Sequence, residues 1–178
     1  ILQALGSRPF STLLDLGTGT GRILQLLAGK YQRGIGIDAS QAMLNVARAR
    51  LAGAEYAHAQ VRHGDLVALP LPKDSADVVV LHQVLHFLAD PQAVLREAAR
   101  ILRPGGRLLV VDFAPHDLEF LRDEHAHRRL GFSDAELSRL FTTAGLEASA
   151  LQHLGSPGAG RLTVTLALAR DTRIQSDL

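Results

Sequence analysis

The feature that most constrains the fold of this chain is the regular alternation of short apolar segments with helical patterns. Strands are predicted at residues 12–16, 33–38, 59–63, 77–81 and 107–113. Helical patterns lie between most of them, and Asp90 followed by Pro91 is typical of a helix start. This alternation predicts a parallel sheet with right-handed crossovers and helices on both faces.

The last third of the chain has a different pattern. Residues 114–132 are charged and rich in histidine, among them His116, His125 and His127, which indicates a solvated lid or helical insert. A capping box at residues 133–136 predicts a helix that ends at Gly145. Two strands, at 146–152 and 161–169, are expected to pair antiparallel and close the sheet. We therefore expect one domain over residues 1–170 and a flexible tail over 171–178.

Composition excludes several classes of protein. Nineteen basic and 18 acidic residues leave a formal charge of +1, so this domain itself is not expected to bind nucleic acid. The chain has no cysteine, which fits a cytoplasmic location and removes thiolate metal sites; we expect no metal. No apolar run is long enough to span a membrane.

A glycine-rich segment follows the first predicted strand, with glycines at positions 17, 19 and 21. Such a turn lets a ligand approach the backbone and the start of the next helix. The NAD fingerprint would require glycine at position 22, where Arg22 stands, and no Lys-Ser or Lys-Thr pair of a P-loop follows. Asp15 beside the loop would repel a pyrophosphate but suits a cofactor that carries cationic groups.

Residues 13–21, Leu-Leu-Asp-Leu-Gly-Thr-Gly-Thr-Gly, resemble the first motif of class I S-adenosylmethionine (SAM)-dependent methyltransferases. Gly36-Ile37-Asp38 is similar to the segment with the family's ribose-binding acid, and Gly64-Asp65-Leu66 resembles its adenine-contacting segment. Residues 77–82 and 102–106 look like its fourth strand and the turn into its fifth. The resemblance covers about residues 11–170. It implies a Rossmann-like α/β fold whose seven-stranded sheet is mostly parallel, with an antiparallel last strand.

Within that class, the chain is most similar to the ubiquinone and menaquinone biosynthesis methyltransferases. Residues 112–117 and 128–132 also resemble the methyltransferase half of proteins fused to an ArsR-type winged-helix regulator. Because the chain begins at Ile1 without an initiator Met, and family members carry helices before the first strand, we expect the natural protein to extend upstream.

The resemblance and the positions of the residues together define a candidate SAM site. It comprises Asp15, Gly17, Gly19, Gly21, Asp38, Ala39, Met43, Asp65, Leu66 and His82. Asp38 could instead be the N-cap of the next helix, but Ser40 is available for that role. That helix is expected to bury Ala42, Met43, Val46, Ala47 and Leu51. Asp65 could merely begin a turn.

His82 is the candidate catalytic residue, because it follows the buried fourth strand, where open α/β sheets bind ligands. Contact of its backbone alone with the cofactor is the alternative. His86, among apolar neighbours, is expected to be a packing residue, and Asp112 either faces the pocket or caps the lid.

These observations predict an enzyme that transfers a methyl group from SAM to a small-molecule acceptor. The alternative is a module that senses SAM or another metabolite for a fused transcriptional regulator, without turnover. A homodimer and an upstream DNA-binding domain stay open as partners.

Overall fold

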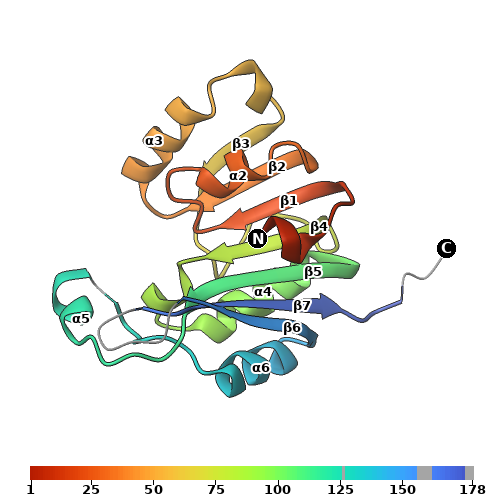
Figure 1. The fold of residues 1–178 in the computed structure, drawn as a ribbon. Coiled ribbons are helices and arrows are strands. Elements are labelled where there is room, and N and C mark those ends of the chain that lie inside the picture. The colour runs from red at the N-terminus through yellow and green to blue at the C-terminus, as the bar shows by residue number, and fades with distance from the viewer. Residues whose placement is uncertain (126, 156–161, 175–178) are drawn as a thin grey trace.

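The computed structural model describes residues 1–125, 127–155 and 162–174, and its framework is one seven-stranded sheet (Figure 1). The strand order is β3-β2-β1-β4-β5-β7-β6. Neighbouring strands from β3 to β5 run parallel, whereas β7 is antiparallel to both β5 and β6. The mostly parallel sheet and its antiparallel last strand are therefore confirmed.

The elements alternate as the sequence indicates. The strands are β1 (Phe10–Leu16), β2 (Tyr31–Asp38), β3 (Ala59–His63), β4 (Ala76–His82), β5 (Leu102–Phe113), β6 (Leu146–Leu154) and β7 (Val164–Asp171). The α-helices are α1 (Leu2–Leu5), α2 (Arg22–Leu26), α3 (Gln41–Arg50), α4 (Pro91–Ile101), α5 (Phe120–His125) and α6 (Asp134–Thr143). Two short 3-10 helices are η1 (Ala54–Tyr56) and η2 (Leu85–Phe87).

Helix starts follow the capping residues that the sequence offers. The Ser40 side chain accepts a hydrogen bond from the Met43 backbone N–H at 3.3 Å and caps α3. Asp90 caps α4 in the same way, with Pro91 in the first turn. At α6 both hydrogen bonds of the capping box are formed between Ser133 and Glu136.

Each face of the sheet carries its own hydrophobic cluster. Helices α4 and α6 cover one face, where Leu95, Ala98 and Phe141 are almost completely buried. Helices α1 and α2 lie on the other face, which buries Leu5 and Leu24 among others (Figure 1). Because β1 pairs in parallel with both β2 and β4, the carboxyl ends of these three strands share one edge of the sheet.

The predicted buried face of α3 is wrong in part: Ala47 is buried and Leu51, just after the helix, is partly buried, as predicted. Met43 and Val46 are 48% and 42% exposed, and Ala42 is exposed as well, whereas Leu44 and Ala47 are completely buried. The helix lies beside the β2 and β3 end of the sheet, so only a narrow stripe of it is covered (Figure 1). The apolar residues beside that stripe stay outside the core.

The prediction of a solvated lid at residues 114–132 is also wrong in part. Leu121, His127 and Phe132 are buried, because the segment folds back on the sheet; the Phe132 backbone N–H donates to the Phe113 carbonyl at 2.8 Å. The side chain of His125 lies outside the described residues, as does Arg161 at the predicted start of the last strand.

The first residue of the tail predicted at residues 171–178 belongs to the last strand. Asp171 is the last residue of β7 and is 2% exposed, because its carboxylate binds the guanidinium of Arg173. Residues 175–178 lie outside the described residues.

Candidate functional site

The glycine-rich loop between β1 and α2 is held against the end of β2. The backbone N–H groups of Gly17 and Thr18 both donate to the Ile37 carbonyl, at 2.8 and 3.1 Å. Gly17 has a φ of 72°, and a Cβ added to it would lie 2.5 Å from a methyl carbon of Val84. Only glycine fits this position, because both the backbone conformation and the close approach exclude a side chain.

Asp38 ties the same loop to the following helix. Its Oδ2 accepts a hydrogen bond from the Gly19 N–H at 2.8 Å, and its Oδ1 accepts one from the Ser40 N–H at 2.8 Å. Each carboxylate oxygen keeps further lone pairs, and the side chain lines a cavity. The cap of α3 is Ser40, as expected, so Asp38 remains available for a ligand.

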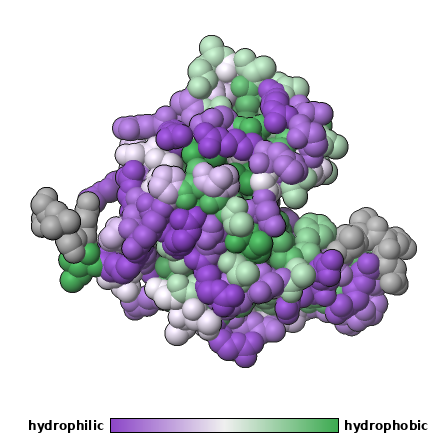
Figure 2. Space-filling view, turned by 180° about the vertical axis from the view of Figure 1, so that it is seen from behind, coloured by the Kyte–Doolittle hydropathy of each residue, from purple (hydrophilic) through white to green (hydrophobic). Residues whose placement is uncertain are grey.

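The cavity lies at the carboxyl ends of β1, β2 and β4 and has a volume of about 590 Å³. Eight of the ten predicted cofactor residues line it: Gly17, Gly19, Asp38, Ala39, Met43, Asp65, Leu66 and His82. The sequence analysis missed Thr18, Thr20, Arg22, Ile23, Val67, Gln83, Val84, Phe87, Leu88 and Val94, which line it as well. Most of the missed residues are apolar, and no motif separates them from core residues. Figure 2 shows hydrophobic surface between the upper and lower parts of the molecule, on the side of this cavity.

Gly19 leaves room for a ligand. A Cβ added to it would meet no heavy atom within 4 Å, and its φ is 52°. The backbone of the loop is therefore open to the cavity at this position. An adenosyl cofactor could approach the chain there without contacting a side chain.

Asp15 and Gly21 do not line the cavity. Asp15 is 1% exposed; its Oδ2 accepts a hydrogen bond from the Thr18 hydroxyl at 2.6 Å, while its buried Oδ1 has no partner among the described residues. Burial raises the pKa of Asp15 from 3.8 to about 7. Asp15 can therefore act on a bound cation only through Thr18 or through its charge.

Gly21 has a packing role instead. It is the N-cap of α2 with a φ of 78°, and an added Cβ would lie 3.2 Å from Leu51 and 3.3 Å from Ala47. Its small size lets α2 begin close to α3.

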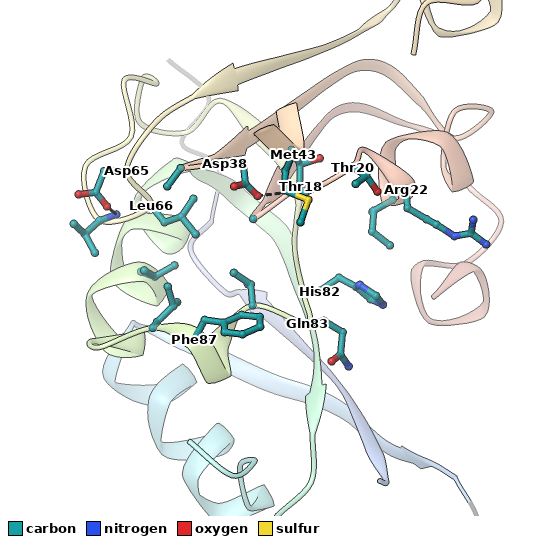
Figure 3. Close-up of a pocket in the computed structure, with 18 residues that line it drawn as sticks. Thr18, Thr20, Arg22, Asp38, Met43, Asp65, Leu66, His82, Gln83 and Phe87 are labelled. Atoms are coloured by element: carbon teal, nitrogen blue, oxygen red, sulfur yellow. Dashed lines mark hydrogen bonds between the residues drawn. The ribbon is translucent and has the colours of Figure 1, made fainter. Parts of the chain in front are cut away.

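The two ends of the cavity differ, as Figure 3 shows. Asp65 and Leu66 lie at one end, and Arg22 and His82 lie at the other, with Asp38 between them. The Asp65 carboxylate accepts a hydrogen bond from the Val67 N–H at 3.1 Å, so it forms the turn that was its alternative interpretation and also borders the cavity.

His82 is the last residue of β4 and is half-buried; it lines the cavity, and in Figure 3 its ring points to the side where Arg22 lies. Burial lowers the pKa of His82, and the charge of Asp112 opposes that effect in part. The next residue, Gln83, has a φ of 57°, a conformation that residues other than glycine rarely adopt. Such conformations cluster at functional sites, and no sequence pattern had indicated this one.

His86 and Asp112 form a buried pair beside the cavity. The His86 Nδ1 lies 2.7 Å from Asp112 Oδ1, and the two side chains are 2% and 1% exposed. Asp112 also accepts hydrogen bonds from the Leu85 and Phe113 N–H groups. His86 is thus a packing residue, as expected, whereas Asp112 neither lines the cavity nor caps the lid: it holds η2, which carries the cavity residue Phe87.

Metal chemistry and membrane insertion have no support in the described residues. Over residues 1–125, 127–155 and 162–174, no group of three His, Asp or Glu side chains could hold a metal ion. In the same part of the chain, no helix has the length and apolar character that crossing a membrane requires.

The strand order, the antiparallel β7 and the ligand cavity at the glycine-rich loop define the class I methyltransferase fold. The model of the methyltransferase domain family matches residues 14–110, more than half of the chain. The chain therefore belongs to the methyltransferase domain family.

Individual relatives agree with this assignment. A probable S-adenosylmethionine-dependent methyltransferase from Mycolicibacterium smegmatis is 38% identical over 140 residues, which cover 76% of this chain and 51% of that protein. The ubiquinone/menaquinone biosynthesis C-methyltransferase of Vibrio parahaemolyticus is 35% identical over 131 residues, 66% of this chain and 47% of that protein. The chain thus spans about half the length of the curated relatives it matches.

A solved structure shows the same fold. A putative methyltransferase from Bacillus halodurans superimposes with a TM-score of 0.84 at 19% identity, over 96% of each chain.

The cavity also fits SAM by its own chemistry. The Oδ1 of Asp15 is buried behind the loop without a partner among the described residues; a nearby sulfonium or ammonium group of SAM would favour the ionised form of this carboxyl group, whose pKa burial raises to about 7. Asp38 offers a carboxylate of the kind that binds ribose hydroxyls. The loop backbone at Gly19 is open to the ligand.

Proposed function

We propose that this methyltransferase transfers the methyl group of SAM to a small-molecule acceptor bound beside His82. The observation that carries the proposal is the continuation of the cavity past the glycine-rich loop to His82, Gln83 and Phe87. A volume of about 590 Å³ lies within the range of small-molecule sites, which is about 300–1,000 Å³. The formal charge of +1 gives no reason to expect a nucleic-acid acceptor.

The cofactor end of the cavity orients SAM. Asp38 would accept hydrogen bonds from the ribose hydroxyls, and Asp65 with Leu66 would border the adenine. Met43, whose side chain is half exposed and lines the cavity, would cover the nucleoside. When bound, SAM supplies a methyl group activated by its sulfonium. The chain then contributes positioning, because holding two reactants in line accounts for much of the rate.

His82 is the residue that we assign to proton transfer. Because burial lowers its pKa, the imidazole is neutral at neutral pH and can accept a proton from a hydroxyl or an acidic carbon of the acceptor. It lies at the end of the cavity opposite Asp65, where the acceptor would bind (Figure 3). Phe87, 42% exposed on η2, offers an apolar surface there.

The relatives' names support a small acceptor. One of them is described as a C-methyltransferase of ubiquinone and menaquinone biosynthesis, which acts on a carbon of a small molecule. Because the chain spans about half of that protein, the acceptor of this chain has to be found by experiment.

The test is formation of S-adenosylhomocysteine from SAM with a panel of small hydroxyl, amine and quinol acceptors. Once an acceptor is identified, His82→Ala should lower the turnover of that acceptor by about 10²- to 10⁴-fold and leave SAM affinity nearly unchanged. The control is His58→Ala, because His58 bonds the Ala28 carbonyl away from the cavity. Full turnover in His82→Ala would mean that positioning alone drives the reaction. SAM binding without turnover on any acceptor would favour the sensing module instead.

A further inference from the structure

A second cavity lies at the opposite end of the sheet, where the parallel strands begin. It has a volume of about 870 Å³ and is called the basal cavity below. Its lining comes from the beginning of β1 and the residues just before it, the beginning of β4 and the turn before it, the beginning of β5, and the segment after β7. The charged residues that line it are Arg8, Lys73, Asp74, Asp77, Arg103, Arg107 and Arg173. This end is on the right in Figure 1, opposite the methyl-transfer cavity. In Figure 2 the same end is on the left, and its surface is mainly hydrophilic.

The charge of the basal cavity is strongly asymmetric. Five basic side chains line it and only two acidic ones, an excess of three positive charges in a chain whose formal charge is +1. Both acids are already engaged. Asp77 accepts hydrogen bonds from the Thr12 N–H at 2.7 Å and from Arg103 at 2.9 Å. Asp74 pairs with Arg173 at 2.9 Å, and Arg173 is bound by Asp171 as well.

The other arginines at this end form no ion pair among the described residues, although Glu147 on β6 is the cross-strand partner of Arg170. Among the described residues, no acidic side chain lies within 4 Å of the guanidinium of Arg8, Arg107 or Arg170. Arg107 donates to the neutral carbonyl of Leu5 at 2.7 Å. Desolvation by burial and the charge of Arg170 lower the pKa of Arg107, and the charge of Asp77 opposes them in part.

Arg107 and Arg170 also oppose each other directly. They are cross-strand partners of β5 and β7, and like charges in this arrangement are destabilising. Arg170 lies beside Gly105 and lines a smaller cavity that shares Pro104, Gly105 and Arg173 with the basal cavity. An anion between these arginines would remove the repulsion, and guanidinium groups match phosphate oxygens in geometry.

The pairing of β4 with β5 contains a bulge next to the basal cavity. Ala76 of β4 pairs with Leu102 of β5, and Val78 pairs with Arg107, so residues 103–106 lie opposite Asp77 alone. Such a bulge re-aims side chains at the end of a strand. It brings Arg103 and Arg107 to the same cavity.

We propose that the basal cavity is a second ligand site of this protein, which binds a pyrophosphate group through Arg8 and Arg107, with Arg170 in the adjoining smaller cavity adding positive charge. Asp77 and Asp74 hold Arg103 and Arg173 at its border. The inference is independent of the proposed methyl acceptor, because the site lies at the other end of the strands.

The test is a calorimetric titration of the chain with inorganic pyrophosphate at constant ionic strength. Saturable binding with a dissociation constant below about 1 mM is expected. Arg107→Gln, which keeps a donor for the Leu5 carbonyl, should weaken binding about tenfold or more, and Arg8→Gln should also weaken it. Arg48→Gln on α3 is the matched control, because Arg48 is an exposed arginine far from this cavity that bonds Asn45. It should bind pyrophosphate like the wild type.

A second titration replaces pyrophosphate with ADP. If ADP binds more tightly than pyrophosphate, and Arg107→Gln weakens that binding, the pyrophosphate group that this site recognises belongs to a nucleotide. If ADP binds as tightly as pyrophosphate or more weakly, the ligand is free pyrophosphate. The proposal is overturned if pyrophosphate does not bind. It is also overturned if Arg107→Gln and Arg8→Gln bind it like Arg48→Gln, or if sulfate at matched ionic strength binds equally well. Unfolding curves of each variant establish that it is folded.

Discussion

Asp15 is a buried carboxyl group whose ionisation should make the stability of this protein depend on pH. The side chain is 1% exposed, and burial raises its pKa from 3.8 to about 7 in the folded protein. In the unfolded chain the carboxyl group returns to its ordinary value, about 3.9. A difference of about three pH units, at about 1.4 kcal/mol for each unit, corresponds to about 4 kcal/mol of folding free energy.

The sign follows from which state of the protein binds the proton more tightly. Between about pH 4 and pH 7 the folded state holds the proton of Asp15 and the unfolded state has lost it. The free energy of unfolding therefore falls as the pH rises through this window, and the loss is complete above pH 7. Asp15→Asn cannot ionise, so between pH 5 and pH 8 its stability relative to wild type should increase by about 2.5 kcal/mol.

The assay is urea unfolding followed by circular dichroism at pH 5, 6, 7 and 8 for both proteins. Other titrating groups are shared, and any change in the hydrogen bond from Thr18 is a constant offset, so both cancel in the pH-dependent difference. The control is Asp65→Asn, which makes the same substitution at an exposed position. A wild-type minus Asp15→Asn difference that stays constant within about 0.5 kcal/mol from pH 5 to pH 8 would refute the reasoning.

Three further predictions concern the methyl-transfer site. Asp38→Ala removes hydrogen bonds from the loop and a ribose acceptor, so the affinity for S-adenosylhomocysteine should fall by about 1 to 3 kcal/mol in calorimetry; a change within about twofold would make the assignment wrong. Gly17→Ala introduces a Cβ that would lie 2.5 Å from Val84, so in urea unfolding it should cost about 1 to 3 kcal/mol more than Gly145→Ala, which shares the positive φ but has open space; equal costs would contradict the close approach. Because the pKa of His82 is lowered, turnover should be flat above about pH 7 and fall only below about pH 6.5, as the imidazole gains its proton; His82→Ala should lack this limb of the profile, and an identical profile would exclude His82 as the base.

Local rules were sufficient to predict most of the sheet. The strands, the capping residues Ser40, Asp90 and Ser133, and the glycines at 17 and 19 follow from signals within a few residues of each other. The buried face of α3 followed only in part, because apolar residues occupy more of its circumference than the sheet covers. Met43, predicted to be both buried and part of the site, lines the cavity and is half exposed.

Contacts between residues far apart in the sequence could not be predicted from sequence patterns. The His86–Asp112 pair joins residues 26 positions apart, and its hydrogen bonds set the position of η2. His127 looked like part of a charged surface, yet its ring packs 4.2 Å from that of His86. The basal cavity gathers four separate segments, each of which contains only one or two basic residues.

Calorimetry with S-adenosylhomocysteine and with NAD measures whether this chain binds an adenosyl cofactor in the cavity at the carboxyl ends of β1, β2 and β4. We expect one S-adenosylhomocysteine bound per chain, an affinity weakened by Asp38→Ala, and no comparable binding of NAD. Equal binding of both ligands, or no binding of S-adenosylhomocysteine to the folded chain, would contradict this expectation.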